Sequence, residues 1–119
     1  MKIYIAGMIT GDKNYKSKFK RAEKLLRSLG HSVMNPAWIV PSDEFRWEDY
    51  MQISAIMQGR CNAVYFLKDW KESKGAKIEF KRCHQLEQTA FFEDSAFSLE
   101  ELKRSSQSRK KKLRGSISL

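Results

Sequence analysis

Apolar residues recur along the chain at two alternating spacings, which together predict an α/β fold. Short runs rich in apolar and β-branched residues predict strands over residues 2–6, 31–34, 61–67 and 89–92. Helical spacing predicts helices over residues 14–29, 47–58 and 73–88, the second of which presents one face made of Tyr50, Ile53, Ser54 and Met57. Such alternation favours a parallel sheet with helices on both faces. We therefore predict a flavodoxin- or Rossmann-like three-layer sandwich with a parallel sheet of four to five strands.

The pattern changes after residue 94. Residues 99–104 keep a helical spacing and predict a short helix, whereas residues 105–112 are polar and basic without periodicity. Seven basic residues and no acidic one lie from Lys103 onwards, and they account for most of the formal net charge of +9. We predict a domain over residues 1–94, then a short helix with a basic, disordered tail over residues 95–119. Since no aromatic residues interleave these charges, the tail suits either a weak electrostatic contact with nucleic acid or a solvated end.

Length and composition narrow the classes of protein that fit. With 119 residues, of which 41% are hydrophobic, the chain can build one small core but not two. No apolar run approaches the roughly 20 residues that span a bilayer, and the run at the N-terminus is too short for a signal peptide. Cys61 and Cys83 lack metal-ligand spacing and are interpreted as reduced thiols, which favours a cytoplasmic location. Neither His31 nor His84 has a companion at metal-ligand spacing, so the sequence predicts no metal. It also predicts no other cofactor and no membrane partner.

Three loops follow the carboxyl ends of predicted strands, at residues 7–12, 35–47 and 68–75. In a parallel sheet these loops meet at one edge, which is where ligands of such sheets bind. The last loop leads into residues 73–80, where a Gly-containing turn and a helix start form a usual place for an anion. The first loop, from Gly7 to Gly11, is neither a dinucleotide fingerprint nor a P-loop. It is interpreted either as a tight turn or as a ligand contact.

Glu79 is the most informative residue of this edge. It lies three positions after Ala76 and four before Cys83, two apolar positions that should face the sheet. A partly buried carboxylate needs partners, and Tyr4 on the first predicted strand can supply a hydroxyl. Two plainer interpretations stay open, namely a carboxylate that only stabilises the helix start and a tyrosine that only fills the core.

Five segments of the chain form motifs in a set order: Lys2–Gly11, Gly30–Pro36, Trp47–Met51, Cys61–Tyr65 and Ser73–Glu79. In this order they resemble the nucleoside 2-deoxyribosyltransferase-like family of small, often phage-encoded domains. The resemblance covers residues 1 to about 93 and none of the tail. The better-understood relatives, which are the transferases and the 2′-deoxynucleoside 5′-phosphate N-hydrolases, cleave the bond between base and deoxyribose. The resemblance therefore implies a Rossmann-like domain whose partner is a small nucleoside or nucleotide, with no cofactor.

The resemblance also implies roles for individual residues. Glu79 would attack the anomeric carbon of the sugar, Tyr4 would orient it, and Asp49 would protonate the leaving base. A carboxylate suits this reaction because an oxocarbenium-like centre develops positive charge that an adjacent anion stabilises and then traps. The implied substrate-binding residues are Gly7, Met8, Ile9, Thr10, Gly11, Asn62, Ser73, Gly75 and Ala76. Ser73 and the helix start that follows it suit a 5′-phosphate better than a free 5′-hydroxyl.

Three positions depart from the pattern of the relatives. Met8 stands where the family usually has Pro, Thr10 where the N-hydrolases have Arg, and Asn62 where an Asp is common. Two hypotheses follow: an enzyme that cleaves the N-glycosidic bond or transfers deoxyribose, and a non-catalytic protein that binds nucleotides or nucleotide signals in the same pocket. Because the relatives complete their sites across a subunit interface, the resemblance also implies a homodimer or a larger homo-oligomer.

Overall fold

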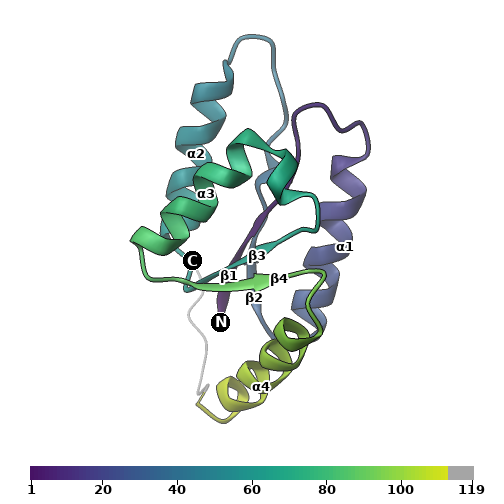
Figure 1. The fold of residues 1–119 in the computed structure, drawn as a ribbon, viewed down its shortest axis with the longest axis vertical. Helices are drawn as coiled ribbons and strands as arrows, with labels where there is room; N and C mark the ends of the chain where they lie inside the picture. The colour runs from purple at the N-terminus through teal and green to yellow at the C-terminus, as the bar shows by residue number, and fades with distance from the viewer. Residues whose placement is uncertain (113–119) are drawn as a thin grey trace.

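The computed structural model describes the backbone of residues 1–112 and the side chains of residues 1–105. The elements are, in order, β1 (Lys2–Ala6), α1 (Tyr15–Ser28), β2 (Ser32–Met34), α2 (Trp47–Gly59), β3 (Ala63–Phe66), α3 (Lys74–Gln85), β4 (Thr89–Phe92) and α4 (Ala96–Lys112). Two short 3-10 helices, η1 (Pro36–Trp38) and η2 (Trp70–Glu72), lie in the loops after β2 and β3. Figure 1 shows the helices arranged around one sheet.

The sheet has four parallel strands in the order β2-β1-β3-β4, which confirms the predicted fold class. The two central strands are β1 and β3, and Tyr4 pairs with Met34 on one side and with Val64 on the other. All four residues of β3 are buried, as expected for a central strand covered on both faces. The chain leaves β1 first towards β2 and later towards β3, so the strand order reverses between β1 and β3. A ligand site of such a fold lies at this reversal point.

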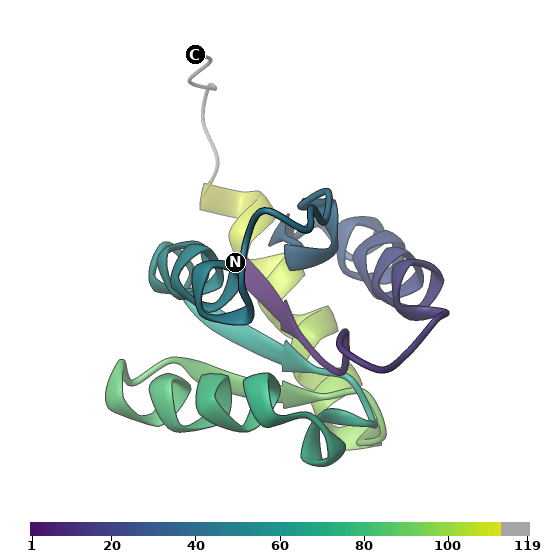
Figure 2. The same ribbon diagram turned by 90° about the horizontal axis from the view of Figure 1, so that it is seen from above.

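Each face of the sheet has its own core. Helices α1 and α4 cover one face, where Ile3 and Ile5 of β1 pack with Phe19, Leu26 and Leu102. Helices α2 and α3 cover the other face, where the alternate residues of β1 and β3 pack with the inner side of α3. Figure 2 shows α2 and α3 together on one side of the strands and α1 on the other. Burying each such aliphatic or aromatic side chain contributes about 1.5–3 kcal/mol, so the two cores hold the sheet between the helix layers.

The loops after β1 and β3 leave the sheet in direct contact with each other. A Cβ added at Gly7 would lie 2.7 Å from Cδ1 of Leu67, so no larger residue fits at this position. The N–H of Leu67 also donates to the carbonyl oxygen of Ala6 at 2.8 Å. The helix that follows, α3, begins at an N-cap, because Oγ of Ser73 accepts the N–H of Ala76 at 3.1 Å. The start of α3 is thereby fixed beside the end of β1.

Helix α2 follows its predicted amphipathic face in part, since Ser54 is buried and Tyr50 and Met57 are half-buried. The buried side chains of α2 are Ser54 and Gln58, whereas Ile53 is 44% exposed and Ile56 is 70% exposed. The reason is that α2 packs against α3 and β1 through polar side chains that find hydrogen-bond partners there. The spacing therefore located the helix and part of its buried face, but not Gln58.

Helix α4 is longer than the predicted short helix over residues 99–104. It begins at Ala96, where Oγ of Ser95 accepts the N–H of Ser98 at 3.2 Å, and its backbone stays helical to Lys112. The helical residues beyond 104 include Lys, Arg and Gln, which are strong helix formers even without a periodic apolar face. Leu102 is fully buried, so the packed unit extends at least to this residue and not only to residue 94. The end of the predicted tail, residues 113–119, lies outside the described residues.

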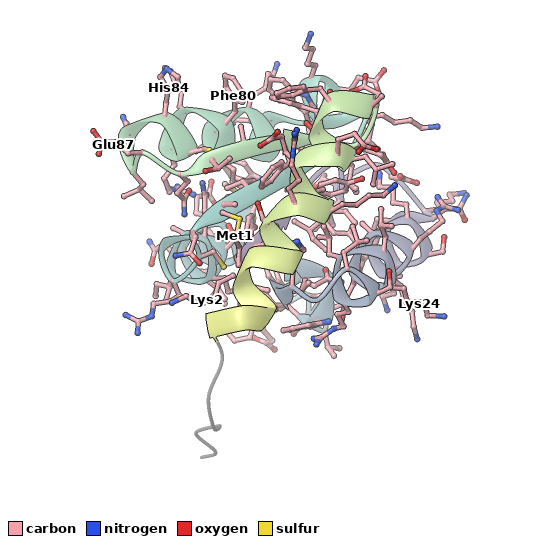
Figure 3. The ribbon with its side chains drawn as sticks, turned by 90° about the horizontal axis from the view of Figure 1, so that it is seen from below. Met1, Lys2, Lys24, Phe80, His84 and Glu87 are labelled. Carbon is pink, nitrogen blue, oxygen red and sulfur yellow. The ribbon has the colours of Figure 1, made fainter. Side chains whose placement is uncertain are left out.

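The buried imidazole of His31 joins the start of the chain to α4. Nε2 of His31 lies 2.8 Å from the carbonyl oxygen of Leu102, and Nδ1 lies 2.9 Å from the amino nitrogen of Met1. Figure 3 shows α4 crossing one face of the molecule with Met1 beside it. His31 is therefore a packing residue. Within residues 1–112, no helix combines the length and the apolar character that crossing a bilayer requires.

Candidate active site

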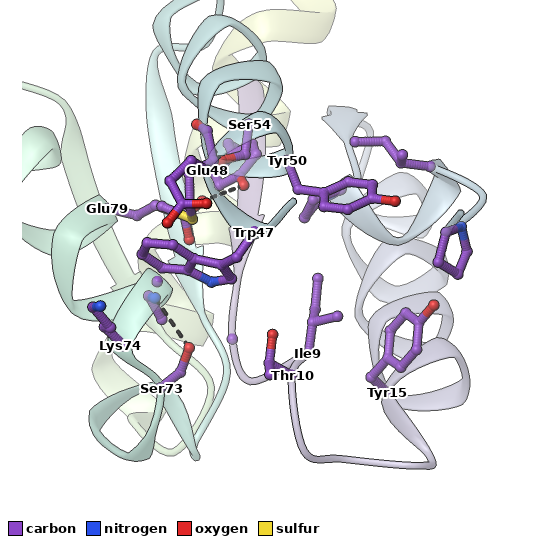
Figure 4. Close-up of a pocket in the computed structure, with 18 of the residues that line it drawn as sticks. Ile9, Thr10, Tyr15, Trp47, Glu48, Tyr50, Ser54, Ser73, Lys74 and Glu79 are labelled. Atoms are coloured by element: carbon purple, nitrogen blue, oxygen red, sulfur yellow. Dashed lines mark hydrogen bonds between the residues drawn. The ribbon is translucent and has the colours of Figure 1, made fainter. Parts of the chain in front are cut away.

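A cavity of about 710 Å³ opens at the carboxyl ends of β1 and β3, where the strand order reverses. Its walls come from the end of β1 and the loop after it, the loop after β2, the first turns of α2 and the start of α3 (Figure 4). Its volume lies within the roughly 300–1,000 Å³ that is typical of small-molecule sites. All three loops predicted to meet at one edge of the sheet contribute to it.

A buried hydrogen bond between Tyr4 and Glu79 forms one wall of this cavity. The phenol of Tyr4 donates to Oε2 of Glu79 at 2.5 Å, which joins the central strand β1 to α3. Tyr4 is fully buried, and Glu79 is 5% exposed although it lines the cavity. The carboxylate is therefore shielded from bulk water but accessible to a bound ligand. A carboxylate that served only to stabilise the start of a helix would not need this burial.

Burial sets the protonation of this pair. It raises the pKa of Glu79 to about 7, against the opposing effects of hydrogen bonds from Tyr4 and Ser54 and the positive charge of Arg82. Burial, and next the negative charge of Glu79, raise the pKa of Tyr4 well above its usual value. At neutral pH the phenol therefore remains a hydrogen-bond donor, while a substantial fraction of Glu79 is ionised. An ionised Glu79 is a poorly hydrated anion held by fixed donors.

The start of α3 forms a second polar wall near Glu79. Ser73, Lys74 and Gly75 line the cavity here, and the N–H groups of a first helical turn favour negative charge. The ammonium of Lys74 lies 4.6 Å from the centre of the Trp47 ring, a cation–π distance. Figure 4 shows Ser73, Lys74 and Trp47 on the same side of the cavity as Glu79. This end can accept a polar or anionic group.

The opposite end of the cavity is mostly apolar. Ile9, Tyr15 and Tyr50 line it, and Figure 4 shows them across the opening from Ser73 and Glu79. The loop after β2 is tied to this wall through Tyr50, whose hydroxyl accepts the N–H of Ser42 at 2.8 Å and lies 2.9 Å from the Ser42 carbonyl oxygen, to which it donates. Aromatic and aliphatic side chains of this kind suit a flat, apolar ring.

A charged cluster ties together two of the loops that line the cavity. The ammonium of Lys18 binds the carboxylates of Asp12 in the loop after β1 and of Asp69 in the loop after β3. Asp69 also accepts the N–H of Met8 at 3.1 Å. Burial alone would lower the pKa of Lys18, but the two carboxylates outweigh it and raise the pKa. The loops after β1 and β3 are therefore held in one arrangement.

Most of the predicted site residues line the cavity: Tyr4, Gly7, Ile9, Thr10, Ser73, Gly75, Ala76 and Glu79. The structure does not bring Met8, Gly11, Asp49 or Asn62 to it. Asp49 instead accepts the N–H of Arg46 at 2.7 Å and caps the first turn of α2. Asn62 precedes β3 at the amino end of the sheet, where its side-chain oxygen accepts the N–H of Lys2 at 2.9 Å. The position of Asn62 after Cys61 in the motif did not indicate that Asn62 would lie at the edge of the sheet opposite the cavity.

Sequence reasoning missed the contribution of α2. Trp47, Tyr50, Met51 and Ser54 line the cavity, and their spacing places them on one face of the helix. The spacing was a usable signal. What it did not indicate was that this face borders a cavity, because the same pattern describes a helix that packs on a sheet.

Comparisons with known proteins place this geometry in a known fold. The structure is similar to a 2-deoxyribosyltransferase from the psychrotolerant bacterium Bacillus psychrosaccharolyticus, with a TM-score of 0.62 and 17% identity over 77% of this chain and 71% of that chain. It is also similar to a 2-deoxyribosyltransferase from Leishmania mexicana, with a TM-score of 0.60 and 14% identity. That match covers 76% of this chain and 62% of the Leishmania chain. The domain therefore has a nucleoside 2-deoxyribosyltransferase-like fold, as the sequence motifs predicted.

The family of the chain is shown by its sequence. The chain belongs to the family described as "Domain of unknown function (DUF4406)", which matches residues 1–91. No curated protein matches the chain. The matched residues contain every strand of the sheet except the last residue of β4, but they exclude α4.

Proposed function

We propose that the protein cleaves the N-glycosidic bond of a nucleoside or nucleotide, or transfers its deoxyribose, with Glu79 as the nucleophile. The observation that carries this proposal is the buried hydrogen bond from Tyr4 to Glu79 at the wall of the cavity. The deoxyribosyltransferase-like fold supports the substrate class. The raised pKa of Glu79 adds support, because strongly perturbed groups in clefts are enriched at functional sites.

The chemistry takes two steps. In the first, one carboxylate oxygen of Glu79 attacks C1′ of the sugar while the bond from C1′ to the base nitrogen breaks. The bonding electrons leave with the base, which takes up a proton from solvent. In the second, water or an incoming base attacks C1′ and releases a proton to solvent, and the ester bond breaks to regenerate the carboxylate. Tyr4 donates to the other carboxylate oxygen and thereby fixes its orientation.

The two ends of the cavity suggest how a substrate would lie. The sugar would face Glu79, with the base against the apolar wall that contains Tyr15 and Tyr50. The 5′ end would point to Ser73 and the start of α3, where a phosphate has an ammonium and main-chain N–H groups nearby. Asp49 as proton donor stays a prediction that its capping bond does not support.

The second candidate function is a non-catalytic binder of nucleotides or nucleotide signals. The observation that favours it is the position of Asp49 outside the cavity, which leaves the leaving base without the acid that the motifs imply. This candidate uses the same pocket and the same orientation of ligand. It requires no covalent step at Glu79.

Incubation with 2′-deoxynucleosides and their 5′-monophosphates, followed by chromatography for free base, separates the two functions. Glu79→Ala should reduce base release at least about a thousandfold, because the nucleophile is lost. Glu100→Ala on the exposed side of α4 is the control and should release base as the unaltered protein does. Release retained in Glu79→Ala contradicts the nucleophile. A thermal shift with nucleotide but no base release by the unaltered protein favours the binder.

The homo-oligomer that the resemblance implies is a separate expectation. Light scattering coupled to size-exclusion chromatography should give a mass that is a multiple of 13.9 kDa. A mass equal to one chain at all concentrations would contradict it.

A further inference from the structure

Helix α2 faces α3 through two polar side chains. Ser54 is 5% exposed and Gln58 is fully buried, and these are the residues of α2 that are buried. They lie four positions apart and therefore on one face of the helix. A helix normally buries apolar residues at such a contact, yet Ile53 and Ile56 of α2 are exposed and Met57 is only partly buried. The polar contact thus calls for an explanation other than packing.

Gln58 reaches the main chain of Glu79. Its Nε2 donates to the Glu79 carbonyl oxygen at 2.9 Å and to Oε1 of Gln88 at 3.1 Å. Its Oε1 accepts from Nη1 of Arg82 at 3.0 Å. One side chain of α2 therefore binds two residues of α3, one turn apart, together with the segment before β4. An apolar residue of similar size could fill the space but could not fix α3 along its axis.

Ser54 lies at the side-chain end of Glu79, whereas Gln58 binds the main chain of Glu79. It lines the cavity, and Figure 4 shows it beside Glu79. Its hydroxyl donates to the carbonyl oxygen of Met51 at 3.0 Å and lies close enough to Glu79 and Tyr4 to lower the pKa of both. A serine has a single hydroxyl hydrogen, so this hydroxyl must turn away from the Met51 carbonyl in order to donate to the carboxylate. An ionised carboxylate is the stronger acceptor.

We propose that Ser54 and Gln58 are positioning residues for Glu79. Ser54 holds the side chain of Glu79, and Gln58 holds its main chain. Gln58 sets the position of α3 relative to α2, and Ser54 directs the carboxylate towards the cavity. With Tyr4, the carboxylate then has polar neighbours from β1 and from α2, two elements that both pack beside α3. The catalytic consequence rests on the proposed function, but the placement of Glu79 does not.

The proposal is tested by Ser54→Ala, read out through the ionisation of Glu79. Carbon-13 NMR of the side-chain carboxyl carbons, with Glu79→Gln to identify the resonance, follows this ionisation without any substrate. Because the Ser54 hydroxyl lowers the pKa of Glu79, its loss should raise this pKa by about one unit, which lowers the ionised fraction of Glu79 at pH 7 about fivefold. The acid limb of kcat/KM should move by the same amount, with KM changed less than about twofold.

Two further variants make the test specific. Ser54→Thr keeps the hydroxyl and should restore the titration of Glu79. Gln52 lies on the exposed side of the same helix, so Gln52→Ala should leave the titration of Glu79 unchanged. An unchanged Glu79 titration in Ser54→Ala, or an equal shift in Gln52→Ala, would overturn the proposal. A protein that releases no base but shows the Ser54→Ala shift would refute only the enzymatic function.

Discussion

At the scale of single residues, the folded protein holds Glu79 at a cost in stability when its carboxylate is ionised. The pKa of Glu79 is about 7 in the folded protein and is about 4.5 for an ordinary glutamate. Between these two values the folded state binds a proton that the unfolded state has lost. The contribution of Glu79 to stability therefore falls as pH rises from about 4.5 to about 7. Such a cost is common where a site is kept for function.

Glu79→Gln removes this cost and gives a prediction that needs no substrate. The variant should be about as stable as the unaltered protein near pH 4.5 and should exceed it by about 3 kcal/mol above pH 7. Urea unfolding at several pH values measures the difference. If the difference in the free energy of unfolding between the two proteins does not grow with pH, the ionised carboxylate of Glu79 does not destabilise the folded state. The same variant should release no base.

Residue-level prediction from sequence succeeded where spacing and chemistry agreed. Glu79 was predicted to face the sheet because it lies between Ala76 and Cys83, and it does so. Tyr4 was identified as its possible donor from the strand that it occupies, and the hydrogen bond is present. Asn62 could not be placed in the same way, because a motif position does not tell which edge of a sheet a residue reaches.

At the scale of elements, the strands were predictable and the orientation of one helix was not. The strands β1 and β4 have the predicted bounds, since runs of apolar and β-branched residues are direct evidence for buried strands. The burial of Gln58 on α2 was not predictable, because Gln58 is polar and its partners lie far away in the sequence. A pattern of apolar residues contains no information about such partners.

The network at Gln58 leads to a prediction about stability. Gln58→Ala leaves the Glu79 carbonyl and the guanidinium of Arg82 without their present partner, and it leaves a cavity. The free energy of unfolding should fall by about 2–4 kcal/mol. Urea unfolding with Gln52→Ala as the matched variant on the exposed face measures this. A loss below about 0.5 kcal/mol would show that water replaces the network without penalty.

At the scale of the whole molecule, α4 belongs to the fold through Leu102, whereas Lys103 and Arg104, the described basic residues that follow it, are exposed. Among the described residues, Leu102 is the last that is buried. It packs with Ile3, Ile5 and Leu26 on the face of the sheet that α1 shares. The basic residues that follow Leu102 account for most of the net charge.

Two variants separate folding from charge. Leu102→Ala should lower the free energy of unfolding by about 2–5 kcal/mol, because it opens a cavity in a full core. Removal of residues 106–119 should leave the melting temperature within about 2 °C of the original. If the basic tail contacts nucleic acid, the same removal should abolish weak DNA or RNA binding and its salt dependence. Unchanged affinity would leave the tail as a solvated end.

The position of Leu102 also bears on where this chain can be divided. The family match ends at residue 91, yet the core of this chain is completed eleven positions later by a helix outside the match. The length of chain that the family defines is therefore shorter than the length that builds the core. Residue 91 is thus an unsafe place at which to cut this protein for expression.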